Sequence, residues 1–73
     1  MAHAHSNTDI DDSLLTEADA AELLSVDVLL LRRWRRRGDG PPYIKFNGCT
    51  RYALKDVRVF VQRARRVPGS GAA

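Results

Sequence analysis

Five arginines occupy the six positions from Arg32 to Arg37, and only Trp34 interrupts them. Like charges this close on one helix repel each other by a few tenths of a kcal/mol per pair, and apart from the candidate cap Asp27 no acid on the same helix offsets them. A guanidinium donates paired hydrogen bonds that match a phosphate or the edge of a guanine. The run is open to interpretation as a solvated helix face, but a cluster that costs stability favours a surface that binds a polyanion.

The charged residues are divided between two parts of the chain. Residues 1–31 contain seven acids and no Lys or Arg, whereas residues 32–73 contain all 12 Lys and Arg against two acids, so their net charge is 12 − 2 = +10. The formal net charge of +3 for the whole chain hides this division. A basic block of this density is typical of nucleic-acid-binding surfaces.

Other kinds of chemistry find little support. Cys49 is the single cysteine, which excludes an intramolecular disulfide, and His3 and His5 lack the further ligands that zinc requires. Residues 14–66 contain no histidine and no glycine-rich phosphate loop. We therefore expect no enzyme, no cofactor, no metal site and no small-molecule substrate. No apolar run approaches the roughly 18 residues of a membrane span, so we expect no membrane partner and a cytoplasmic location, on the nucleoid of a bacterial host.

The elements that carry the arginine run have clear start and stop signals. Thr16 precedes Glu-Ala-Asp and predicts a helix that begins after it and runs through Leu24. Ser25 and Val26 form a short break, and Asp27 caps a second helix over residues 28–37 that ends at Gly38. A connection of about three residues between two short helices is typical of a helix-turn-helix.

The second helix is predicted to bury one face and expose another. Val28, Leu31 and Trp34 recur at i, i+3 and i+6, which predicts a core face. Around the remaining surface we expect Leu29, Arg33 and Arg36 opposite the core, Arg32 and Arg37 beside them, and Arg35 at the core edge with its head pointing outward.

After the prolines at 41 and 42, two short alternating segments flank Asn47-Gly48, which predicts a β-hairpin with a two-residue turn. We expect one hairpin face to carry Ile44, Phe46, Thr50 and Tyr52, and the other to carry Tyr43, Lys45, Cys49 and Arg51. Lys45 and Arg51 would then share an outward face. A third helix is expected over Leu54 to Arg65, with an apolar stripe of Leu54, Val57, Phe60, Val61 and Ala64.

This order of elements predicts a mainly α fold with a small β-hairpin: a winged helix-turn-helix of helix, helix, hairpin wing and helix. The folded domain is expected over residues 14–66. Residues 1–13 and 67–73 are expected to be a disordered leader and a disordered tail.

Several segments in this order resemble the excisionase and AlpA-like helix-turn-helix proteins, within the wider superfamily of MerR-type winged helices. The segments are Leu15-Thr16-Glu17-Ala18-Asp19-Ala20-Ala21-Glu22-Leu23-Leu24, Leu31-Arg32-Arg33-Trp34, Gly40-Pro41-Pro42-Tyr43, Arg51-Tyr52 and Lys55-Asp56-Val57. The resemblance covers about residues 14–61. It implies that the second helix enters the major groove of double-stranded DNA while the wing reaches the backbone or the minor groove.

The resemblance nominates Arg32, Arg33 and Arg36 on the helix and Lys45 and Arg51 on the wing, and Leu29, Arg37 and Asn47 complete the predicted DNA-contacting set. It also implies a recombination directionality factor that binds cooperatively, side by side, bends DNA and assists a tyrosine integrase in phage excision. The alternatives are a small AlpA-like transcription regulator and a basic adaptor that binds RNA or an acidic protein.

One segment departs from the family pattern. Residues 28–30 are usually polar or basic in such proteins, whereas this chain has Val28, Leu29 and Leu30. Apolar side chains at the start of the helix limit base reading to thymine methyl groups, or they meet a neighbouring subunit. We therefore expect modest sequence specificity with affinity that depends on arginine.

Overall fold

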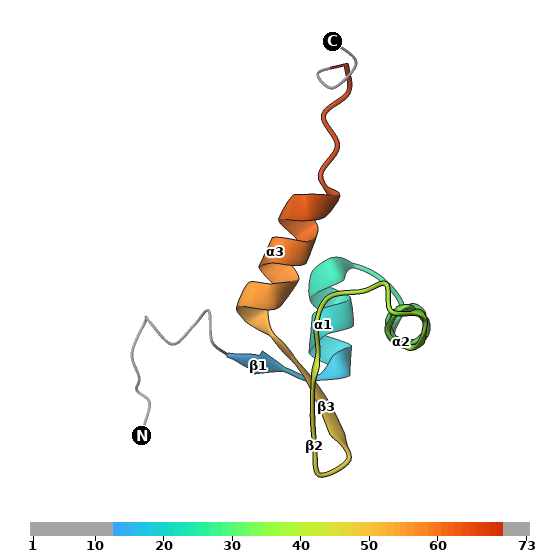
Figure 1. Cartoon of the computed structure of the whole chain (residues 1–73), viewed down its shortest axis with the longest axis vertical. Helices are drawn as coiled ribbons and strands as arrows, with labels where there is room; N and C mark the ends of the chain where they lie inside the picture. Colours follow the sequence, from blue (N-terminus) through green and yellow to red (C-terminus); the bar gives the residue numbers. More distant parts are fainter. Residues whose placement is uncertain (1–12, 70–73) are drawn as a thin grey trace.

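The computed structural model describes residues 13–69 (Figure 1). Most of the predicted leader and part of the predicted tail, residues 1–12 and 70–73, lie outside the described residues. The elements within this range are β1 (Leu14–Leu15), α1 (Glu17–Leu24), α2 (Val28–Arg37), β2 (Ile44–Phe46), β3 (Cys49–Ala53) and α3 (Leu54–Ala64). The predicted winged helix-turn-helix is confirmed: the two-helix unit, the hairpin and the final helix follow in the expected order.

Local caps fix the ends of α1 and α2: Thr16, Asp27 and Gly38 as predicted, and Ser25, which was predicted only as part of the break between the helices. The Thr16 hydroxyl accepts a hydrogen bond of 3.1 Å from the backbone N–H of Asp19, and the Asp27 carboxylate accepts one of 2.8 Å from that of Leu29. Ser25 takes the left-handed conformation at φ 58°, and Gly38 does so at φ 79°. These local interactions end each helix sharply, so that the chain turns from α1 into α2 within three residues.

The core lies where α1, α2, β3 and α3 meet. Ala20 and Ala21 of α1 are buried, and their small side chains let Leu31 of α2 approach closely; Leu31, Tyr52 and Val57 are fully buried. The predicted core face of α2 is confirmed, because Val28 and Trp34 pack against this cluster on either side of Leu31. That packing fixes which side of α2 faces solvent.

The predicted hairpin is confirmed, and a third strand joins it. Asn47 and Gly48 have φ angles of 50° and 77°, as a two-residue hairpin turn requires. β1 pairs antiparallel with β3, which gives the strand order β1-β3-β2. The Ser13 carbonyl also accepts a hydrogen bond of 2.8 Å from the backbone N–H of Leu54. β1 was not predicted, because a two-residue strand carries too little alternation to be recognised from the sequence.

The predicted division of the hairpin faces is wrong. Lys45 pairs with Thr50, and Phe46 pairs with Cys49. Directly opposed residues in an antiparallel pair project to the same side of the sheet. One face therefore carries Ile44, Phe46, Cys49 and Arg51, and the other carries Tyr43, Lys45, Thr50 and Tyr52. Strict alternation along the sequence does not continue through the turn, because the turn reverses the chain and puts residues 46 and 49 on one side.

α3 ends one residue earlier than predicted and buries only part of its apolar stripe. Val57 is fully buried and Phe60 half-buried, and the Phe60 ring lies 6.0 Å from that of Trp34. Val61 and Ala64 are exposed, because no described element covers the second half of the helix. Figure 1 shows α3 running away from the hairpin, so the hairpin turn and the last turn of α3 point in opposite directions.

Candidate nucleic-acid interface

The face of α2 turned away from the core carries Leu29, Arg33 and Arg36. These residues are spaced i, i+4 and i+7, and all three are exposed, Leu29 by 61%. Within residues 13–69, neither Arg33 nor Arg36 has a side-chain hydrogen bond or an ion pair. The predicted position of these three residues opposite the core is confirmed. The guanidinium groups of Arg33 and Arg36 are available to an external acceptor.

Two other arginines of α2 are held by an acid from α1. The Glu17 carboxylate accepts a hydrogen bond of 3.1 Å from Nε of Arg32 through its Oε1, and its Oε2 accepts one from Nη1 of Arg35. Burial alone would raise the pKa of Glu17, but the hydrogen bonds and charges of the two arginines outweigh it and lower that pKa. The hydrogen bond that Arg35 donates to Glu17 is also the main cause that raises the pKa of Arg35.

The repulsion within the arginine run is therefore weaker than predicted from the sequence. Arg37 forms a third ion pair, 3.3 Å from Nη2 to Oδ2 of Asp39. Three of the five arginines thus have a carboxylate partner, and one of those carboxylates comes from a different helix. Glu17 lies 15 and 18 positions before its partners, so no local pattern in α2 could reveal it. The available signal was an acid in the first turn of the neighbouring helix.

The prediction that the head of Arg35 points outward is wrong. Its side chain is only 19% exposed, and its guanidinium lies 5.7 Å from the centre of the Tyr43 ring. The Tyr43 ring in turn lies 6.4 Å from that of the buried Tyr52. The Tyr52 hydroxyl contributes a smaller part of the raised pKa of Arg35, yet it makes no well-formed hydrogen bond to any residue in the described part of the chain. Glu17, Arg35 and Tyr43 together connect α1, α2 and the hairpin.

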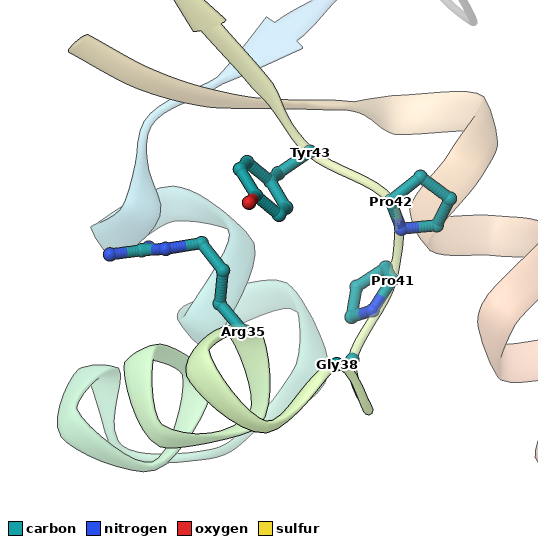
Figure 2. Close-up of a pocket in the computed structure, with 6 residues that line it drawn as sticks. Arg35, Gly38, Pro41, Pro42 and Tyr43 are labelled. Atoms are coloured by element: carbon teal, nitrogen blue, oxygen red, sulfur yellow. The ribbon is translucent and has the colours of Figure 1, made fainter. Parts of the chain in front are cut away.

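A shallow hollow lies between the end of α2 and the start of the hairpin. Its volume is about 300 Å³, and it is lined by Arg35, Gly38, Gly40, Pro41, Pro42 and Tyr43. Figure 2 shows the Arg35 guanidinium beside the Tyr43 ring, with the two prolines on the segment that leads into the hairpin. Arg35 is bonded to Glu17, and the hollow lies where α2 and the start of the hairpin meet.

The predicted wing residues lie apart. Lys45 is exposed and has no ion pair among residues 13–69, whereas Arg51 is half-buried and donates a hydrogen bond of 2.9 Å to the Thr50 carbonyl. Lys45 shares a hairpin face with Tyr43, whose ring meets Arg35 of α2, so Lys45 lies on the face turned toward α2. Arg51 lies on the opposite face. Asn47, at the tip of the turn, is exposed.

Some kinds of site are not found in the described residues. Between residues 13 and 69 no group of three His, Cys, Asp or Glu side chains could hold a metal ion, and Cys49 is a free, exposed thiol. None of α1, α2 and α3 is long and apolar enough to cross a membrane.

The capped two-helix unit, the exposed arginine face and the hairpin define a winged helix-turn-helix DNA-binding domain. The model of the helix-turn-helix domain family matches residues 14–65 of the 73, and the chain belongs to this family, which includes AlpA-like and excisionase-like small DNA-binding proteins. No curated protein and no solved structure gives a significant match. The protein is accordingly a small DNA-binding protein.

Proposed function

We propose that this protein is a non-enzymatic, excisionase-type recombination directionality factor, which bends DNA and assists a tyrosine integrase in excising a phage or prophage. The observation that carries the proposal is the exposed face of α2, where an apolar first turn at Leu29 precedes two uncompensated arginines, Arg33 and Arg36. Arginine contacts to phosphate supply affinity without base information. An apolar first turn supplies little base reading, and such a protein gains occupancy from neighbours bound beside it.

In this proposal α2 lies in the major groove of double-stranded DNA and the hairpin contacts the flanking backbone or minor groove. The proposed contact residues are Leu29, Arg32, Arg33, Arg36, Arg37, Lys45, Asn47 and Arg51. Arg33 and Arg36 are the principal contacts, because their guanidinium groups are free of acids. The Arg32 side chain is 46% exposed although its Nε is bonded to Glu17, so its two outer nitrogens can reach a phosphate. The face of the hairpin with Lys45 is the one directed toward α2.

The test of cooperative assembly uses the best duplex recovered from a randomised library. Binding is measured on DNA with one copy of that site and on DNA with two adjacent copies, by mobility shift and by a bending assay. We expect tighter binding per site on the longer DNA and slowly migrating, bent complexes. Equal and independent occupancy without bending would favour the alternative, a small AlpA-like transcription regulator on the same fold. Leu29→Ser is the variant to compare, since Leu29 is the apolar candidate for a thymine methyl or a neighbouring subunit.

The location of the binding sites separates the two functions further. Tandem sites beside a recombination attachment site indicate excision, whereas a single operator inside a promoter indicates regulation. An adaptor that binds RNA or an acidic protein would instead bind single-stranded RNA at least as tightly as duplex DNA. The proposal also places the protein in the bacterial cytoplasm, on DNA, with the integrase as its protein partner.

A further inference from the structure

A second group of arginines lies at the end of α3, outside the predicted site. Arg63 is in the last turn of the helix, and Arg65 and Arg66 follow its final residue, Ala64. We call these three residues the C-terminal arginine segment. All three are exposed, and Arg65 has extended backbone angles, φ −60° and ψ 140°. In Figure 1 this end of α3 points away from the hairpin.

A structural role accounts for only one of the three. Nη1 of Arg66 donates hydrogen bonds of 3.2 Å to the Arg63 carbonyl and 3.0 Å to the Arg65 carbonyl. This arrangement satisfies carbonyl groups at the helix end, where a positive charge is also favourable. The side chains of Arg63 and Arg65 have no hydrogen bond or ion pair within residues 13–69. Two more positive charges at the same place repel the first, so helix capping does not explain them.

The positive charge here is less compensated than on α2. On α2, Glu17 and Asp39 contact Arg32, Arg35 and Arg37, so five positive charges stand against two negative ones, a net of 5 − 2 = +3. The C-terminal arginine segment has three arginines and, in the described part of the chain, no carboxylate within ion-pair distance. The far end of α3 therefore carries a second cluster of positive charge equal in net charge to that of α2, and none of its arginines has a carboxylate partner in the described residues.

We propose that the C-terminal arginine segment binds phosphates of the same DNA duplex, outside the stretch contacted by α2 and the hairpin. This inference rests on the proposed DNA binding and extends its footprint. Exposed guanidinium groups on the last turn of a helix and on the extended residue that follows it can meet neighbouring phosphates, which they bind in paired hydrogen bonds. The competing acceptor on a second copy of this chain is the exposed face of α1, where Asp19 and Glu22 offer two carboxylates for three arginines.

The test compares the full chain with the variant Arg63→Gln/Arg65→Gln/Arg66→Gln on a duplex that extends one helical turn beyond the central site on both sides. If two to three phosphate contacts are lost, the slope of log affinity against log salt becomes shallower by about 2 to 3. The ratio of variant to wild-type Kd then shrinks by roughly ten- to forty-fold between about 50 and about 200 mM salt. On a duplex trimmed to the central site, the two proteins should bind alike.

The variant with three lysines, Arg63→Lys/Arg65→Lys/Arg66→Lys, keeps the charge and should keep most of the salt slope. Should the glutamine variant fail to fold, Arg65→Gln alone suffices, since the Arg65 side chain has no partner in the described chain and its loss should reduce the slope by about 1. An unchanged slope on the long duplex overturns the inference, as does an equal loss on the trimmed duplex.

A third protein separates this inference from the proposed function. Arg33→Ala/Arg36→Ala should weaken binding on both the long and the trimmed duplex. If that variant loses affinity while the glutamine variant keeps the wild-type slope, only the C-terminal contact is refuted. If neither variant differs from a wild-type protein that binds duplex DNA poorly, the proposed function is refuted as well. Loss of self-association with an unchanged salt slope would assign the segment to α1 of a second copy and overturn the DNA assignment.

Discussion

Glu17, the first residue of α1, forms an ion pair with Arg35 in the last turn of α2, and the same carboxylate bonds Arg32. The arginine run is therefore divided by function. Arg35 joins α1, α2 and the Tyr43 ring at the base of the hairpin, while Arg33 and Arg36 remain directed outward. One short basic helix thus both fixes its own position in the fold and presents charge to a ligand.

Replacing Glu17 by Gln should lower the free energy of unfolding by about 1–3 kcal/mol at pH 7, because Arg35 is partly buried and loses its carboxylate partner. The lowered pKa of Glu17 means that this stabilisation is present above the ordinary glutamate pKa of about 4.3 and is lost as the pH falls through the folded-state value. Urea unfolding at neutral pH and in acid measures both effects. The matched control is Glu22→Gln, an exposed acid on the same helix.

In acid, wild type and Glu17→Gln should converge in stability. A difference that persists unchanged below the folded-state pKa would contradict the ion-pair account, as would a Glu22→Gln effect of the same size at pH 7.

Substitutions along α2 should separate binding from folding. Arg33→Ala and Arg36→Ala should each weaken DNA binding by about 1–3 kcal/mol with little change in thermal unfolding, because both side chains are exposed and free of acids. Arg35→Ala should instead reduce stability, since it leaves the Glu17 carboxylate without its main partner. Fluorescence anisotropy on duplex DNA and thermal denaturation measure the two effects. If Arg36→Ala unfolds the domain, the assignment of the α2 faces is refuted.

The parts of the fold that the sequence predicted are those determined by neighbouring residues. Helices begin after Thr16 and Asp27 and end at Gly38 through contacts within one turn, and Asn47-Gly48 supplies the φ angles of the hairpin turn. The core face of α2 followed from its helical period. Each of these signals is contained in a few consecutive positions, so a single sequence suffices to recognise it.

The parts that could not be predicted depend on contacts between distant segments. The hydrogen bond that Arg35 donates to Glu17 and the pairing of β1 with β3 join residues that are 18 or more positions apart. The direction of the Arg35 side chain depends on that same bond. The hairpin faces, by contrast, are determined by neighbouring residues, because the two-residue turn fixes which residues pair.

Trp34→Ala should unfold or severely destabilise the domain. Trp34 packs against the core and the Phe60 ring, and loss of a large core aromatic costs about 3–5 kcal/mol, with the lower end expected because Trp34 is only partly buried. Gly40→Ala should also disturb the packing of Trp34, since an added Cβ at position 40 would lie 3.2 Å from the Trp34 Cβ. The control is Phe46→Ala, because Phe46 is 44% exposed near the hairpin tip. A folded Trp34→Ala protein that has lost only DNA binding would refute the core assignment.

The two wing cations should contribute unequally, because they lie on opposite faces of the hairpin. Lys45 shares the face of Tyr43, which meets α2, so a duplex seated on α2 approaches Lys45 first. Lys45→Ala should weaken binding similarly on all sequences and reduce the salt slope by about 1, because a phosphate contact carries no base information. Arg51→Ala should change the slope less, since Arg51 is half-buried and bonded to the Thr50 carbonyl. DNA titrations of both variants at several salt concentrations measure the two slopes, and thermal unfolding checks that each variant is still folded. If Lys45→Ala and Arg51→Ala reduce the salt slope equally, both hairpin faces contact DNA, which requires the wing to enter a groove edge-on.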